Sequence, residues 1–174
     1  MRFVIVASLT ALALAGCGPS GVGHGTTGGA PNNGACALIT NANTLFGAGE
    51  RSFGYAGLDA MAATCEFISA DGKRGGDIIT YTPESLHGVT PAAQMQTVTS
   101  AWDGQTETPL SAIDGLGEAA QIARDLPGYQ TQIAFRKGPM LVLIAARSGD
   151  DAITGEQLAR NMAAAAANNI ALAR

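Results

Sequence analysis

The first 34 residues differ so sharply from the rest of the chain that they determine where a folded domain begins. Residues 3–16 carry no charge and are mostly apolar, and they follow a single basic residue, Arg2. Residues 17–34 hold seven glycines and two prolines, and Val22 is their only sizeable apolar side chain. Because such a segment buries too little apolar surface to fold, it is predicted to be a flexible tether. We therefore expect one folded domain over residues 35–174.

A basic start, a short apolar run and small residues at its end are typical of a secretory signal peptide, which predicts that residues 1–16 are removed on export. The run is shorter than the ~20 apolar residues that a membrane-spanning helix needs. Its last residues and the cysteine that follows, Leu14-Ala15-Gly16-Cys17, resemble the lipobox of bacterial lipoproteins. The resemblance implies that the sulfur of Cys17 is joined to diacylglycerol and that cleavage makes Cys17 the N-terminus. The alternative is an ordinary signal peptide cut near Gly16, with Cys17 incidental.

The lipobox resemblance also implies a location. The protein is expected to be anchored to the cell membrane by lipid, without spanning it, and to lie on the extracytoplasmic side. Gly18 stands where inner-membrane lipoproteins of Gram-negative bacteria usually have aspartate. In a Gram-negative host the resemblance therefore favours the outer membrane, with the domain facing the periplasm.

Two cysteines, Cys36 and Cys65, remain in the expected domain. In an exported protein such a pair is predicted to form a disulfide bond. The alternative is two buried thiols, which a reducing compartment would favour. Their spacing is too long for a CxxC redox motif, and two cysteines without a partnering histidine make a poor zinc site. No cofactor or metal is therefore expected.

The charges of the chain argue against nucleic acid as a partner. The sequence has 10 basic and 14 acidic residues, and removal of Arg2 with the signal peptide would leave a net charge of −5. The basic residues are scattered along the chain, whereas nucleic-acid binding requires a basic stripe or patch.

The first half of the domain shows one helical and one hairpin pattern. Thr40 is a suitable N-cap for a short helix that Gly47 would end. A strand headed by Cys65 then runs to the turn signal Asp71-Gly72, and residues 75–82 are predicted to form the returning strand.

The pattern then changes to helical, because Thr90 and Pro91 are typical of a helix start. Met95, Val98 and Trp102 follow at helical spacing and are expected to pack on the sheet. Residues 103–109 are predicted to be a loop, and residues 111–122 a turn that enters a strand.

The last part of the domain carries the strongest signals. Residues 129–136 alternate, with Tyr129, Thr131, Ile133 and Phe135 predicted on one side and the intervening residues on the other. Residues 140–146 are apolar throughout, as expected of a central strand covered on both faces. Thr154 and Gln157 form a capping-box pattern before an alanine-rich helix. The order of elements predicts an α+β domain, with a mostly antiparallel sheet packed by two or three helices.

Five short stretches give the domain a further resemblance: CALIT (36–40), CEF (65–67), DGLGEAA (114–120), FRKGPMLVLIAA (135–146) and the final alanine-rich helix. Together they resemble small cell-envelope lipoproteins of unknown function, best known in actinobacteria and related to extracytoplasmic sensor domains. Some of these relatives share a PsbP-like α/β/α sandwich. They often have tryptophan where this chain has Phe67. The resemblance implies a binding or sensing module and no shared catalytic residue.

His87 is the only histidine of the expected domain. A catalytic Ser-His arrangement would use it with a nearby serine such as Ser85, but the chain lacks GxSxG and nothing in the sequence orients a base. The protein is therefore expected to bind a small ligand or an envelope protein and not to be an enzyme. An envelope hydrolase that uses His87, and a purely structural surface lipoprotein, are the alternatives.

Overall fold

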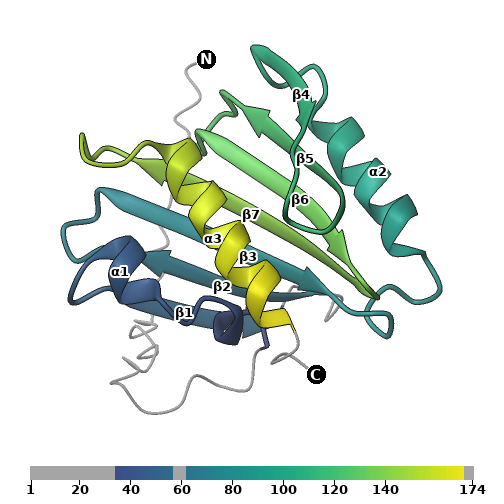
Figure 1. Cartoon of the computed structure of the whole chain (residues 1–174), viewed down its shortest axis with the longest axis horizontal. Helices are drawn as coiled ribbons and strands as arrows, with labels where there is room; N and C mark the ends of the chain where they lie inside the picture. Colours follow the sequence, from purple (N-terminus) through teal and green to yellow (C-terminus); the bar gives the residue numbers. More distant parts are fainter. Residues whose placement is uncertain (1–33, 57–61, 171–174) are drawn as a thin grey trace, which may run out of the picture.

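The computed structural model of the protein describes residues 34–56 and 62–170 (Figure 1). Within these ranges a seven-stranded sheet has the order β1-β2-β3-β7-β6-β5-β4, and every neighbouring pair is antiparallel. The elements in chain order are the 3-10 turn η1 Cys36–Leu38, α1 Ala42–Phe46, β1 Arg51–Ala56, β2 Ala63–Ile68, β3 Arg74–Tyr81, α2 Pro91–Trp102, β4 Thr108–Ala112, β5 Glu118–Arg124, β6 Thr131–Lys137, β7 Met140–Ser148 and α3 Gly155–Asn169. The predicted α+β class, with its mostly antiparallel sheet and its helices, is confirmed.

Helices pack on both faces of the sheet. The α3 face is covered by α3, with α1 and η1 beside it, and Figure 1 shows α3 crossing the strands. The main core lies on this face and includes Phe67, Ile133 and Phe135. The opposite α2 face has a smaller core, in which Met95 and Trp102 of α2 pack with Leu141 and Leu143 of β7, among others.

Helix α2 covers only part of its face. It packs mainly on β6 and β7, which leaves much of the α2 face of β1, β2 and β3 beyond its reach. The clearest sign is on β1, where Phe53 is 40% exposed and Tyr55 is 52% exposed. In the described part of the chain, the α2 face is therefore exposed along its β1 edge.

Strand β7 is the central strand, as its continuous apolar run predicted. Val142 and Ile144 point into the core on the α3 face, while Leu141 and Leu143 point to α2. Because both faces of β7 are covered, its residues are apolar on both sides and do not alternate with polar ones.

Helix α3 begins with the predicted capping box. The Thr154 hydroxyl accepts a hydrogen bond from the Gln157 amide at 3.1 Å, and the Gln157 side-chain oxygen accepts one from the Thr154 amide at 3.0 Å. Leu158, Met162 and Ala166 of this helix are fully buried. The small alanine side chains let the helix approach the sheet closely.

Helix α2 also begins and packs as predicted. The Thr90 hydroxyl accepts a hydrogen bond from the Ala93 amide at 3.2 Å, and Pro91 is the first helical residue. Met95 and Trp102 are buried against the sheet, with Val98 partly buried beside them.

The first helix and two edge strands correct the sequence-based expectations. Helix α1 follows Asn41, not Thr40, and neither residue caps it through its side chain. Strand β1 was missed because Gly54 lies in its centre and glycines surround it. Strand β4 begins inside the expected loop 103–109 and contains Pro109, which an edge strand tolerates because its outer N–H groups need no partner in the sheet.

Tyr129 also departs from its expected side. Strand β6 begins only at Thr131, so Tyr129 belongs to the loop before it. Thr131, Ile133 and Phe135 are buried in the sheet, the two larger ones in the core under α3, whereas the Tyr129 hydroxyl donates a hydrogen bond to Asp77 on the α2 face. Alternation fails here because the residue lies outside the strand.

Cys36 and Cys65 lie at disulfide-bonding distance, with 5.1 Å between their Cα atoms. The pair joins η1 to β2, and Cys65 is fully buried. The predicted signal peptide, Cys17 and all of the tether except Gly34 lie outside the described residues. None of the helices within 34–56 and 62–170 is long and apolar enough to cross a membrane.

Candidate functional site

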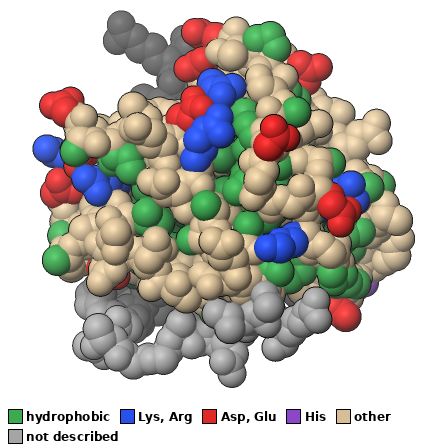
Figure 2. Space-filling model, viewed as in Figure 1, with side chains coloured by type: hydrophobic (Ala, Val, Ile, Leu, Met, Phe, Trp, Pro, Cys, Tyr) green, Lys and Arg blue, Asp and Glu red, His purple; other side chains and the backbone are tan. Residues whose placement is uncertain are grey.

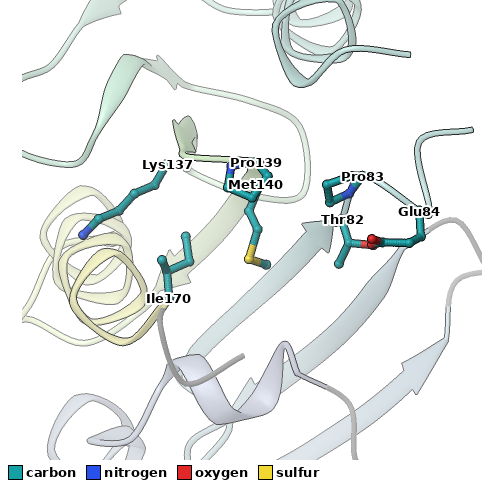
Figure 3. Close-up of a pocket in the computed structure, with 7 residues that line it drawn as sticks. All are labelled: Thr82, Pro83, Glu84, Lys137, Pro139, Met140 and Ile170. Carbon is teal, nitrogen blue, oxygen red and sulfur yellow. The ribbon is translucent and has the colours of Figure 1, made fainter. Parts of the chain in front are cut away.

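A pocket of about 380 Å³ opens at one end of the sheet, beside the C-terminal end of α3. Figure 3 shows its lining residues, which come from three separate segments of the chain. They are Thr82, Pro83 and Glu84 after β3, Lys137, Pro139 and Met140 at the β6–β7 turn, and Ile170 directly after α3.

Local hydrogen bonds shape the side of the pocket that follows β3. The Ser85 hydroxyl accepts a bond from the Thr82 amide at 2.8 Å and donates one to the Thr82 carbonyl at 2.9 Å. The Leu86 amide donates to the same carbonyl at 3.1 Å, and the Leu86 side chain is fully buried. The chain is thereby folded back, so Pro83 and Glu84 stand at the pocket mouth.

The β6–β7 turn forms the opposite side. Gly138 adopts a φ of 58°, a left-handed conformation that glycine takes without steric cost. The turn presents the Pro139 ring and the Met140 thioether to the pocket (Figure 3). Met140 is only 6% exposed, so its side chain forms part of the pocket floor.

The two charged residues of the pocket, Lys137 and Glu84, have different roles. The Lys137 ammonium donates a hydrogen bond to the Ala167 carbonyl in the last turn of α3, where a positive charge is favourable to the helix dipole. This leaves the methylene stem of Lys137 to line the pocket. Glu84 is exposed at the rim of the pocket. Hydrogen bonds from the Glu84 backbone amide and from the Thr82 hydroxyl lower the pKa of the Glu84 carboxyl, which favours its ionised form.

These properties define what the pocket can bind. Ligand pockets typically enclose about 300–1,000 Å³ and are mostly apolar, with a few polar groups that orient the ligand. Here two prolines, a methionine and an isoleucine supply the apolar walls. The carboxylate at the mouth would favour a ligand whose polar end is a hydrogen-bond donor or a cation.

A second polar cluster lies on the α2 face and consists of Asp77, Tyr129 and Arg147. Burial raises the pKa of Asp77, and the hydrogen bond from Tyr129 and the charge of Arg147 oppose that rise. Burial and the bond to Asp77 raise the pKa of Tyr129 far above its usual range. A Cβ at Gly75 would lie 3.0 Å from Nε of Arg147, so the absent side chain makes room for the guanidinium.

The Asp77 cluster holds the loop before β6 against β3. The sequence did not predict it, because Asp77 and Tyr129 are 52 residues apart and only the sheet brings them together. In β3 the polar Asp77 stands directly before the apolar Ile78, and neighbouring residues of a strand face opposite sides of the sheet. This was the one local signal that Asp77 faces away from the main core.

In the described part of the chain, the structure places no hydrogen-bonded catalytic partner beside His87. His87 is exposed and has a φ of 46°, in the left-handed region. The Ser85 hydroxyl, the nearest candidate nucleophile in sequence, is bonded to the backbone of Thr82. Among residues 34–56 and 62–170, no serine hydroxyl or carboxylate is hydrogen-bonded to His87.

The other predicted site residues do not converge on the pocket. Cys36 and Cys65 pair with each other within the main core, and Cys17 is outside the described residues. The part of the chain that the structure describes contains no group of three or more His, Cys, Asp or Glu side chains that could hold a metal. The pocket itself was missed, because its walls come from segments far apart in sequence.

Neither protein-family models, nor curated proteins, nor solved structures match this chain. Function is therefore argued from the residues of the chain itself.

Proposed function

We propose that the protein is a membrane-anchored lipoprotein of the cell envelope, whose extracytoplasmic domain binds a small, largely apolar ligand. The observation that carries the proposal is the pocket between the β6–β7 turn, the segment after β3 and Ile170. This pocket lies where the end of the sheet meets the end of α3, and its volume of about 380 Å³ is within the range of ligand sites.

The ligand class follows from the lining. An apolar body would contact Pro83, Pro139, Met140 and Ile170, and a donor or cationic end would meet the carboxylate of Glu84. The pKa of Glu84 is lowered, so that carboxylate stays ionised over the physiological range of pH. Among the described lining residues an anionic end has no comparable partner, because the Lys137 ammonium is bonded to the end of α3.

The anchor is argued from the N-terminal sequence. The lipobox-like residues before Cys17 support acylation of that cysteine, and the glycine-rich tether would let the domain move above the membrane surface. Pairing of Cys36 with Cys65 fits an oxidising, extracytoplasmic compartment. In a Gram-negative host the anchored protein would face the periplasm from the outer membrane.

The binding proposal is tested with the fluorescent amine N-phenyl-1-naphthylamine, whose emission rises in apolar surroundings. The exported Cys17→Ser form is used, because a chain without acyl groups needs no detergent. Saturable binding is expected. Pro139→Trp, which fills the pocket from an exposed turn position, should weaken it by about tenfold or more.

Ala101→Trp is the matched control, since Ala101 is exposed on α2 and does not line the pocket. Equal loss of binding in both variants, or binding that Pro139→Trp leaves unchanged, would contradict the pocket as the site. Absence of any binding by the folded wild-type domain would favour the structural alternative.

A further inference from the structure

The two edges of the sheet are built differently. Strand β4 contains Pro109, and its pairing with β5 is interrupted by a register shift between Thr108 and Ser111. Proline and bulges on an edge strand hinder the addition of a further strand. The β4 edge therefore carries two features that protect it from pairing.

The β1 edge has none of these features. All six residues of Arg51–Ala56 pair with β2 in continuous register, and the strand contains no proline and no lysine. Among the described residues no strand pairs with its outer side. A regular, exposed edge of this kind is a template for strand addition.

The side chains of β1 add an apolar surface to this edge. Phe53 and Tyr55 are two of the three large hydrophobic residues that are exposed in the described part of the chain. Together with Arg51, which is also exposed, they project from alternate positions onto the α2 face, where Phe53 lies opposite Glu66 of β2. Three neighbouring side chains at one edge thus offer two aromatic rings and one guanidinium.

We propose that two copies of this chain associate by antiparallel pairing of their β1 strands, centred on Phe53. In this register Phe53 faces Phe53 of the second copy, and each Arg51 faces Tyr55 of the other. Directly opposed side chains in an antiparallel pair have Cβ atoms about 4.5–5.5 Å apart, close enough for aromatic and cation–π contacts. The two sheets become one continuous sheet across a two-fold axis.

A second copy fits this edge because the strand is complementary to itself. Arg51 is the only charged residue of β1, and the register keeps the two arginines apart. They are offset by four residues along the strand, or about 14 Å at ~3.4 Å per residue. An isologous interface needs such self-complementarity, and anchoring in one membrane would raise the concentration of the partner copy.

The register is tested by disulfide crosslinking of the full-length protein in its native envelope. Phe53→Cys should form a crosslinked dimer under mild oxidation, since the two sulfurs would meet at the symmetry axis. Arg51→Cys and Tyr55→Cys are matched controls on the same strand and face. Each alone should give about tenfold less dimer, because a disulfide requires Cα atoms within about 7 Å.

Arg51→Cys co-expressed with Tyr55→Cys should restore the crosslink, because these positions face each other across the axis. In the Cys17→Ser form, the additional substitution Phe53→Lys should convert the dimer to a monomer, because the two lysine ammonium groups would face each other at the axis. Light scattering measures this change in mass. Equal crosslinking at all three positions, no crosslink at Phe53, or a crosslink to a protein of different mass would overturn the proposal. The proposed dimer is independent of ligand binding, so the crosslinking results test the β1 interface and not the pocket.

Discussion

Small residues in this domain create space for their neighbours, and Gly76 of β3 is the clearest case. A Cβ at this position would lie 2.5 Å from Sδ and 2.9 Å from Cε of Met162, and 3.0 Å from Cζ of Phe46. Met162 is fully buried and Phe46 nearly so. The glycine therefore lets α1 and α3 pack on the same stretch of β3.

Gly76→Ala is predicted to destabilise the domain by about 1–3 kcal/mol, the usual cost of overpacking a well-filled core. The measurement is the midpoint of urea unfolding. Gly149→Ala is the matched control, because its Cβ would come no closer than 3.8 Å to the Lys73 carbonyl oxygen. If the two alanine variants unfold at the same midpoint, close packing at Gly76 is not what stabilises this region.

Between elements, an ion pair fixes the start of α3 to the sheet. Glu156, in the first turn of α3, binds Arg124 of β5 at 2.7 Å and Arg160 of its own helix at 2.8 Å. Hydrogen bonds from Arg124, the largest favourable contribution, and from Arg160 lower the pKa of Glu156 to about 2. The contact couples the start of α3 to a strand on the far side of β6.

The lowered pKa of Glu156 predicts a dependence of stability on pH. The ordinary value is 4.5 and the folded value about 2, so the stabilisation is present above pH 4.5 and lost as pH falls toward 2. Glu156→Gln should flatten the fall in unfolding free energy over that interval. Arg124→Gln should have a larger effect on the pKa than Arg160→Gln, as measured by NMR titration, and the reverse order would contradict the assignment.

How far the sequence predicts each element depends on where its contacts come from. The caps at Thr90 and Thr154 and the doubly covered strand β7 follow from local pattern, so they were predicted correctly. The edge strands β1 and β4 were not, because Gly54 and Pro109 are typical of loops and only pairing with a neighbour makes them strands.

The pocket shows the same limit at the site. Pro83, Pro139 and Ile170 carry no motif, and no spacing in the sequence relates them. They become neighbours because the end of β3, the β6–β7 turn and the end of α3 meet at one end of the sheet. Contacts of this kind depend on the finished fold, so no local pattern could predict them.

For the whole molecule, the proposed anchor and the folded domain are separate parts with separate tasks. The domain packs a main core under α3 and a smaller core under α2, and the proposed lipid site at Cys17 precedes it by the length of the tether. Figure 2 shows the α3 side of the domain, with positive and negative side chains spread over it and no extended basic patch. This described face offers no evident attraction to anionic lipid, and acylation of Cys17 is the means of membrane attachment that we propose.

Cys17→Ser is predicted to move the protein from the membrane fraction to the soluble exported fraction, because it removes the cysteine of the lipobox-like motif and the other two cysteines, Cys36 and Cys65, lie at disulfide-bonding distance from each other. Detergent phase partitioning followed by immunoblotting measures the change. Cys36→Ser is the control that leaves the lipobox intact, and its product should still partition into detergent. Unchanged partitioning of Cys17→Ser would contradict the lipoprotein proposal.

The most direct test of the binding proposal is the position of the bound probe within the domain. With ¹³C-methyl methionine in the Cys17→Ser form, the methyl signals of Met140, Met95 and Met162 report on the pocket, the α2 core and the α3 core respectively. Saturation with N-phenyl-1-naphthylamine is predicted to shift the Met140 signal and to leave the other two in place. A shift confined to Met95 or Met162, or no shift at Met140 under saturating probe, would contradict the claim that this pocket is the binding site.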